Sequence, residues 1–467
     1  VAPAVAQQVP RPEGYPATAP VPGPVPTLTV PKPVRRVLPN GLTVLYAPQR
    51  ELPMVAAVLV TRGGTGDEPA ELPGLAAFTA AMLDEGAAGK SALEIAGELE
   101  SLGASLNTTA GWDAAQTSLL VLRKNLPGAL RVMADVVTRP GFPEAEVQRI
   151  RQERTINLRR AADAPSAIAA NAFTALSYPG GHPYGRFATV EGTERTDRES
   201  MSAFHERFYA PEGATLILTG DVDPDAVQPL VEAAFGGWRS GEPQPTYEVA
   251  AAQPARARTI YLVDKPGAPQ SEVRIGHPVA PRDTPDYFPL TVLNTLLGGP
   301  FVGSRLNANL REKHGYTYAA GSLLSLRRSA GPIMAVAAVA TPKTDSSVIE
   351  FMRELERLRE EPVPEDELHG AKQFLALGLP ARLETPPDVA ARLAELVVAG
   401  VPTDFYDTYV QRVMAVTPDD VLRVARQYLH PDRAVVVVVG DRAAVEPGLR
   451  ALGFGAVETR SASDYTR

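Results

Sequence analysis

The sequence predicts an α+β protein made of two homologous domains, each a mainly antiparallel sheet covered by helices. The segment Phe208 to Asp221 (FYAPEGATLILTGD) aligns without a gap on Tyr428 to Asp441 (YLHPDRAVVVVVGD), at a constant offset of 220 residues. A repeat of this length indicates a domain duplication, because solenoid repeats are much shorter. In each half, strand-like runs in hairpin-like pairs are mixed with long helices, which favours helices layered on a sheet.

The repeated segment has the same local pattern in both halves. Each copy follows an amphipathic helix, Arg198 to Arg207 or Asp420 to Gln427. Each copy then turns at a proline and continues as a strand rich in β-branched residues that ends in Gly-Asp.

The starts of the two halves also correspond, because each has two strands followed by a helix. We expect the strands of each half to pair with each other: Leu42 to Ala47 with Met54 to Thr61, and Thr259 to Asp264 with Glu272 to His277. The helices that follow are expected at Leu72 to Asp84 and at Phe288 to Leu297.

A further helix of the first half begins with a capping box, Ser91 followed by Glu94, and is expected to run through Leu102. Its apolar residues at helical spacing are assigned to the core. They are Leu93, Ala96, Leu99 and Leu102.

The duplication and the composition together predict the domain boundaries. A proline-rich extended tail covers residues 1–33, the first domain 34–239, a linker rich in Pro, Gln and Ala 240–256, and the second domain 257–467.

Composition excludes several classes of function. With 467 residues the chain is long enough for two full cores. Its 46 basic and 54 acidic residues give a net charge of −8, and without a basic run a nucleic-acid partner is not expected. The chain has no cysteine, which excludes disulfides, thiolate metal sites and cysteine nucleophiles. No apolar stretch reaches the ~20 residues of a membrane span.

The opening segment carries ten prolines before Val34, a composition that cannot bury a core. We interpret it as a solvated tether left after removal of a signal peptide, which predicts a bacterial periplasmic protein. An artificial start of the chain is the alternative.

Three stretches depart from ordinary packing patterns. They are GLAAFTAAMLDEG at Gly74 to Gly86, SYPGGHPYGRF at Ser177 to Phe187, and LGGPFVGSRLNANLREKHGYTY at Leu297 to Tyr318. Together with the duplication they resemble the pitrilysin/insulinase family of zinc peptidases, in its bacterial branch similar to the mitochondrial processing peptidase. The third stretch resembles the family signature L-G-G-x-x-x-S-R-L-x-x-x-L-R-E-K-x-G-x-x-Y closely, whereas the second is a weaker match to an H-P-Y-G turn.

The resemblance implies that the first stretch is the family's catalytic helix without its catalytic side chains. In the family this helix reads G-L-A-H-F-x-E-H-M, and its H-x-x-E-H residues bind zinc and activate water. The corresponding positions here are Ala77, Ala80 and Ala81. Alanine offers neither a lone pair to a metal nor a carboxylate to a proton, so this helix can pack but cannot ligate.

The family's third zinc ligand is a glutamate on a later helix, here expected at Pro143 to Ala161. Its distance ahead of the turn at Pro165 places Asn157 at the ligand position. A shift of one turn would place Glu153 there instead, but one carboxylate without the two histidines makes a poor zinc site.

Arg311 and Tyr318 match the arginine and tyrosine of the third stretch. We expect Arg311 to end a helix that Gly315 terminates in a left-handed conformation, with Tyr318 opening the next strand, so that the two side chains converge. The resemblance implies that this pair binds substrate and stabilises the oxyanion from the domain opposite the zinc. Tyr316 is the competitor of Tyr318, although the spacing of this branch favours Tyr318.

Four residues before this element form its flexible entry and are candidates for substrate binding. They are Gly298, Gly299, Gly303 and Ser304. A simple C-cap is the alternative for the glycine pair.

The remaining motifs indicate no other chemistry. The pair Glu365 and His369 lies in a highly charged segment, which is typical of a solvent-exposed helix face. No two histidines of the chain have metal-ligand spacing. Neither a nucleophile elbow nor a phosphate-binding loop is present.

The sequence therefore predicts the non-catalytic subunit of a heterodimeric zinc peptidase, inactive alone. No cofactor is expected in this chain, and a homologous partner subunit would supply H-x-x-E-H and the zinc. An unfolded peptide would bind in extended form and add a strand to the partner's sheet edge. The alternative is a purely structural relative, resembling the core subunits of the respiratory cytochrome bc1 complex. A scaffold has no reason to keep both Arg311 and Tyr318.

Overall fold

The computed structural model describes residues 32–239, 251–252 and 255–466. The predicted tail, except for residues 32 and 33, and most of the predicted linker at 240–256 lie outside the described residues. Among the described residues, no helix is both long enough and apolar enough to cross a membrane.

The first half contains a six-stranded sheet in the order β1-β2-β8-β3-β7-β6. Its strands are β1 (Val34–Val37), β2 (Thr43–Pro48), β3 (Met54–Thr61), β6 (Ser105–Ala110), β7 (Ala115–Leu122) and β8 (Thr215–Gly220). All its pairs are antiparallel except β2 with β8. A separate two-stranded ribbon consists of β4 (Gly86–Ala87) and β5 (Lys90–Ser91).

The second half contains a six-stranded sheet in the order β11-β12-β10-β13-β9-β14. Its strands are β9 (Thr259–Asp264), β10 (Gln270–Ala280), β11 (Thr317–Leu324), β12 (Gly331–Ala340), β13 (Val435–Gly440) and β14 (Ala456–Arg460). Strand β9 pairs parallel with β13 and β14, and the other pairs are antiparallel.

The two sheets confirm the duplication. Strands β8 and β13 begin and end 220 residues apart, and each lies at the same place in its sheet. The α+β class, with two largely antiparallel sheets covered by helices, is also confirmed. Only the outer strands differ, since β1 pairs antiparallel with β2 whereas β14 pairs parallel with β9.

The expected pairing of the first two strands in each half is wrong. Strand β8 lies between β2 and β3, and β13 lies between β9 and β10. Both inserted strands are fully buried, because they are apolar on both faces and both faces of each sheet are covered.

Fifteen α-helices cover the sheets in the described part of the chain. Those of the first half are α1 (Leu75–Met82), α2 (Ala92–Ser101), α3 (Leu126–Thr138), α4 (Glu144–Ala161), α5 (Pro165–Ser177), α6 (Val190–Arg195), α7 (Arg198–Phe208) and α8 (Pro224–Phe235). Those of the second half are α9 (Tyr287–Gly298), α10 (Thr344–Glu360), α11 (Glu365–Gly378), α12 (Pro386–Ala399), α13 (Tyr409–Met414), α14 (Pro418–Tyr428) and α15 (Arg442–Ala451).

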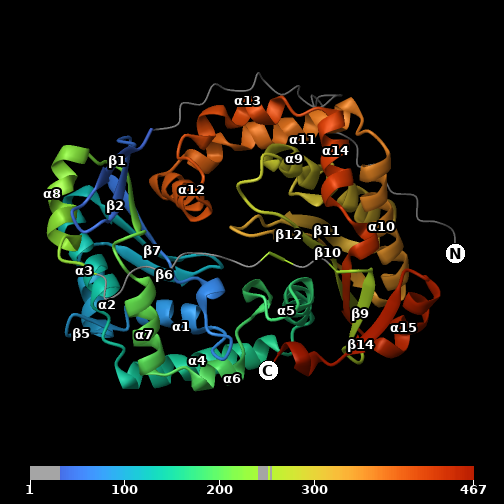
Figure 1. Ribbon diagram of the computed structural model, residues 1–467, viewed down its shortest axis with the longest axis horizontal. Helices are drawn as coiled ribbons and strands as arrows, with labels where there is room; N and C mark the ends of the chain where they lie inside the picture. The colour runs from blue at the N-terminus through green and yellow to red at the C-terminus, as the bar shows by residue number, and fades with distance from the viewer. Residues whose placement is uncertain (1–31, 240–250, 253–254, 467) are drawn as a thin grey trace, which may run out of the picture.

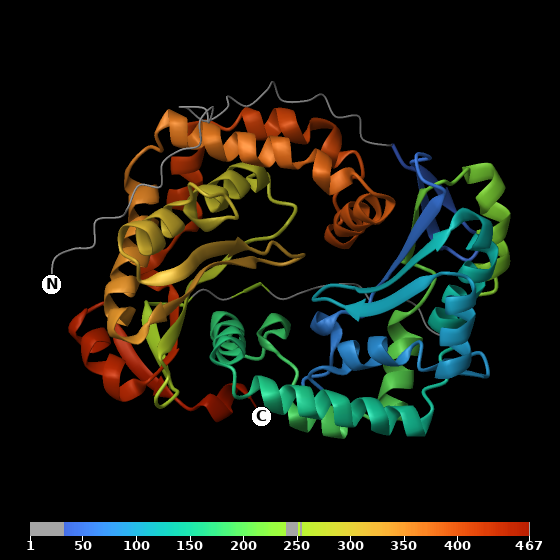
Figure 2. The same cartoon turned by 180° about the vertical axis from the view of Figure 1, so that it is seen from behind.

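Two helices cross between the halves and hold them together (Figures 1 and 2). Helix α5 of the first half packs against β10 and β13 of the second sheet, and α12 of the second half packs against β3 and β8 of the first. Phe173 of α5 joins a cluster with Val437, whereas Leu393 of α12 joins one with Ile217. Each sheet therefore buries one face under a helix of the other half.

Two helix predictions need correction. Helix α1 begins at Leu75 rather than Leu72, because Gly74 at its N-cap has φ +98°, a left-handed conformation that a helix cannot contain. On α2 the capping box of Ser91 is confirmed, but Leu93 is 85% exposed and Ala96 is also exposed. The buried residue is Ile95, which lies on a different face of the helix from Leu93.

Candidate functional site

Helix α1 is fixed in place by a buried carboxylate at its N-terminus. Glu68 is 4% exposed, and its two carboxylate oxygens accept the N–H groups of Gly74 and Ala76, each at 2.8 Å. These are backbone donors that a helix N-terminus leaves without partners. Burial raises the pKa of Glu68 to about 7, against the opposing effect of those two hydrogen bonds.

The three alanines on α1 occupy one region of the helix, as expected. Ala80 is 1% exposed, and Thr108 of the edge strand β6 donates its hydroxyl to the Ala80 carbonyl at 2.7 Å. Ala77 and Ala81 are partly exposed. The Thr108 hydroxyl thus ties the helix to the edge strand of the first sheet.

Arg154 of α4 also contacts α1, and no sequence motif indicated this arginine. Its Nη1 donates to the Ala77 carbonyl at 3.4 Å, and its guanidinium lies 5.2 Å from the centre of the Phe78 ring. Burial lowers the pKa of Arg154, because the charged form loses hydration. Its heptad spacing from the buried Val147 was the signal that could have placed it on the inner face of α4.

The two residues considered for a third ligand do not point to a metal site. Asn157 is exposed, and the side chain of Glu153 is 61% exposed and 3.8 Å from Arg149. Within the described ranges, no group of three or more His, Asp or Glu residues could hold a metal ion. Methyl groups on α1 and a partly buried guanidinium beside them do not fit Zn²⁺, which prefers imidazole, thiolate and carboxylate ligands.

Arg311 and Tyr318 lie together on the second half. Arg311 is in a π-helix, η4 (Asn307–Lys313), a rare conformation that is frequent at functional sites. Gly315 has φ +63°, which confirms the expected left-handed end, and Tyr318 follows near the start of β11. The Arg311 guanidinium lies 5.2 Å from the centre of the Tyr318 ring, which is 84% exposed.

The structure distinguishes Tyr318 from its competitor Tyr316. The ring of Tyr316 stacks on His314 at 4.8 Å, and the Lys343 ammonium lies over it at 5.7 Å. Tyr316 is therefore engaged within the chain, whereas Tyr318 presents its ring and hydroxyl outward beside Arg311.

Two polar residues anchor the π-helix: Arg305, just before it, and Asn309, within it. Arg305 forms a two-pronged ion pair with Glu367 of α11, at 2.7 and 2.9 Å. Asn309 donates to Glu350 at 2.9 Å and to Glu354 at 2.6 Å, both on α10. These contacts leave Arg311 on the outer face of η4.

The four predicted substrate-binding residues have different surroundings. A side chain at Gly298 would come within 2.5 Å of the Ser322 backbone nitrogen, so this glycine permits α9 to approach β11 closely. Gly299 is the C-cap of α9, and Ser304 is 1% exposed. Gly303 alone among the four is exposed, so a role in peptide binding stays a prediction that fits Gly303 best.

The SYPGGHPYGRF stretch joins the two halves. Tyr184 donates its hydroxyl to Asp113, whose other carboxylate oxygen accepts the backbone N–H of Arg328 at 3.1 Å. The Arg327 guanidinium stacks 3.9 Å from the Trp112 ring and 4.9 Å from the Tyr184 ring. This turn therefore fixes the loop between β11 and β12 against the first half.

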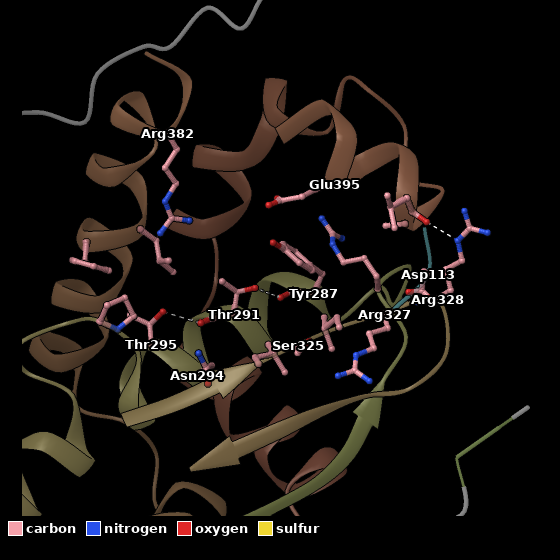
Figure 3. A pocket seen from close by; sticks show the side chains of 18 of the residues that line it. Asp113, Tyr287, Thr291, Asn294, Thr295, Ser325, Arg327, Arg328, Arg382 and Glu395 are labelled. Atoms are coloured by element: carbon pink, nitrogen blue, oxygen red, sulfur yellow. Dashed lines mark hydrogen bonds between the residues drawn. The ribbon is translucent and has the colours of Figure 1, made fainter. Parts of the chain in front are cut away.

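A cavity of about 470 Å³ lies next to this joint (Figure 3). It is lined by α9, α11, α12 and the β11–β12 loop of the second half, and by Asp113 and Gln116 of the first. Its charged lining includes Arg282, Arg382 and Glu395. In Figure 3 the side chains of Arg382 and Glu395 point into the same space. No sequence motif indicated this cavity, because its walls come from segments far apart in the chain.

Comparison with known protein families gives two consecutive matches. A family model described as "Insulinase (Peptidase family M16)" matches residues 43–179, and one described as "Peptidase M16 inactive domain" matches residues 195–375. An uncharacterized zinc protease of Mycobacterium tuberculosis is 30% identical over 410 residues, which cover 85% of this chain and 91% of that protein. The chain belongs to the insulinase family.

Another curated relative matches over a similar length, and two solved structures have a similar fold. An uncharacterized zinc protease of Streptomyces coelicolor is 26% identical over 419 residues, 88% of this chain and 90% of that protein. The crystal structure of a peptidase M16 inactive domain from Pseudomonas fluorescens superimposes with a TM-score of 0.81 at 25% identity, over 88% of this chain and 98% of that one. A Helicobacter pylori protease gives a TM-score of 0.83 at 21% identity, over 88% and 100%.

Proposed function

We propose that this chain is the non-catalytic subunit of a heterodimeric zinc peptidase. A homologous partner subunit supplies the H-x-x-E-H helix and the zinc, and this chain supplies Arg311 and Tyr318 to a peptide bound there. One combination of features carries the proposal: α1 has only methyl groups where the family binds zinc, while Arg311 and an exposed Tyr318 lie together. A chain that did not contact a peptide would not need an exposed tyrosine beside an arginine.

The chemistry of the pair suits a peptide substrate. The guanidinium group of Arg311 can donate two hydrogen bonds to a backbone carbonyl. The phenol of Tyr318 can donate one to the oxyanion that forms when water attacks the scissile bond. Because the Tyr318 hydroxyl is exposed, a peptide held on a second subunit can reach it without rearrangement of this chain.

The test is hydrolysis of a quenched peptide by the mixed subunits. Arg311→Ala and Tyr318→Phe should each lower kcat/KM by about a hundred- to a thousandfold, the range for loss of one transition-state donor. Tyr316→Phe is the matched control and should leave turnover unchanged, because Tyr316 stacks on His314 within the chain. Unchanged turnover in both Arg311→Ala and Tyr318→Phe would favour the alternative, a scaffold with no part in proteolysis.

The cellular location forms part of the same proposal. We propose that the subunit works in a bacterial periplasm, on the basis of the proline-rich composition of residues 1–33. Cell fractionation followed by detection of the chain tests this directly, and recovery in the cytoplasmic fraction would contradict it.

A further inference from the structure

Two arginines line the cavity beside the joint, and Glu395 is the carboxylate whose charge they influence. In the described part of the chain, the guanidinium groups of Arg282 and Arg382 form no hydrogen bond and no ion pair. Arg282 stacks 3.7 Å from the centre of the Tyr287 ring and 4.6 Å from that of Phe405. This stacking holds the faces of the guanidinium and leaves its N–H edge for another group.

The two acidic residues that line the cavity accept hydrogen bonds from groups other than Arg282 and Arg382. Asp113 accepts hydrogen bonds from the Tyr184 hydroxyl and the Arg328 backbone. Glu395 accepts a hydrogen bond from Arg392 Nη1 at 2.6 Å. Burial raises the pKa of Glu395, against the opposing charges of Arg392, Arg282 and Arg382. The lining has four arginines, Arg282, Arg327, Arg328 and Arg382, against these two carboxylates, so the cavity has an excess of positive charge in a chain whose net charge is −8.

The cavity lies at one end of a strand whose other end carries the proposed peptide contact. Strand β11 is an edge strand that runs from Thr317, next to Tyr318, to Leu324, which lines the cavity. An extended chain alongside it covers about 3.3 Å per residue. A peptide of about six residues, or about 20 Å, would therefore reach from Tyr318 to the cavity.

We propose that this cavity binds a carboxylate of the peptide substrate, through Arg282 and Arg382. The carboxylate is either the free C-terminus or an Asp or Glu side chain, since both present the same planar group to a guanidinium. That the ligand is a substrate peptide rests on the proposed function. The carboxylate site adds a substrate class to the proposed function, namely peptides that carry an acidic group about six residues from the bond that is cleaved.

The experiment measures binding of fluorescent eight-residue peptides to the full chain without its partner, by anisotropy. Four peptides separate the two sources of the carboxylate: a free C-terminus, a C-terminal amide, an amide with one internal Glu, and the same amide with Gln. We expect the free acid or the Glu peptide, or both, to bind about tenfold more tightly than the neutral counterpart, because hydrogen bonds to ionised groups are the stronger ones.

The variants Arg282→Gln and Arg382→Gln should each remove this preference for a carboxylate. Arg442→Gln, an exposed arginine on α15, is the matched control and should retain it. Circular dichroism establishes that each variant is folded, and Arg311→Ala should retain the preference because Arg311 lies outside the cavity.

Equal binding of acidic and neutral peptides would overturn the proposal, as would an unchanged preference in both cavity variants. Inorganic phosphate that binds more tightly than every peptide, with no preference among the peptides, would make the cavity a site for small anions and would also overturn it. These outcomes leave the proposed function standing if Arg311→Ala still lowers turnover in the mixed subunits.

Discussion

At the scale of single residues, Arg154 places a positive charge beside the alanines of α1. Its guanidinium is partly buried beside Ala77 and Phe78, and its Nε has no hydrogen-bond partner in the described part of the chain. The three alanines could be read from the sequence because the motif fixes their positions. Arg154 could not, because the burial of a long polar side chain depends on how α4 packs against α1.

Restoring the zinc ligands should therefore require removal of Arg154. A variant with Ala77→His, Ala80→Glu, Ala81→His and Asn157→Glu should bind zinc at least about tenfold more weakly than the same variant that also carries Arg154→Gln, because a partly buried like charge repels the metal. Zinc content and competition with a chelating dye measure this.

The matched control replaces Arg159, an exposed arginine of the same helix, by Gln in the four-ligand variant. Zinc affinity in this control should stay low. Equal zinc affinity with and without Arg154 would show that the guanidinium does not oppose the metal.

At the scale of elements, α1 is a short helix whose position depends on one buried carboxylate. The pKa of Glu68 is about 7 in the folded chain against an ordinary value of 4.5, so the folded state holds this proton more tightly than the unfolded state. The stability that this group contributes is complete below about pH 4.5 and is lost as the pH rises through about 7.

Glu68→Gln should remove this pH dependence. Between about pH 5 and pH 8, the wild-type chain should lose free energy of unfolding relative to the variant by about 1–3 kcal/mol. Urea unfolding at a series of pH values measures the difference, with Glu71→Gln, an exposed neighbour, as the control. A constant difference across this range would contradict a raised pKa.

The elements themselves were predicted well where the signal is local. Strands β3 and β9 have the expected bounds, and β8 and β13 keep the offset of 220 residues, because period and β-branched content are properties of neighbouring residues. Pairing was not predictable in this way. Strand β8 enters between β2 and β3 from a distant part of the chain, and no local pattern records that insertion. On α2, two alternative apolar faces exist, and packing selects the one with Ile95.

At the scale of the whole molecule, the exchange of α5 and α12 makes the two halves one body (Figure 1). Phe173 belongs to α5 of the first half, but it packs with Val435, Val437 and Val439 of β13 in the second sheet. This exchange places the β11–β12 loop against the first half and so creates the cavity between them. Neither feature has a signature within one domain.

Phe173→Ala should consequently weaken the second half, although the substitution lies in the first. We expect a loss of about 3–5 kcal/mol in the free energy of unfolding, as for a buried aromatic side chain. Hydrogen exchange should show faster exchange in β13. Phe204 lies in the core of the first half alone, so Phe204→Ala should accelerate hydrogen exchange in β8 more than in β13. Unchanged protection of β13 in Phe173→Ala would mean that the halves are independent.

The divided active site is tested most directly by titrating this chain into a fixed amount of its H-x-x-E-H partner and following peptide hydrolysis. We predict negligible activity for either chain alone and a rise that reaches its plateau at an equimolar ratio. The chain with Arg311→Ala and Tyr318→Phe together should still bind the partner but should give little activity at saturation. Full activity of the partner alone, or of the complex with the doubly substituted chain, would contradict the proposal.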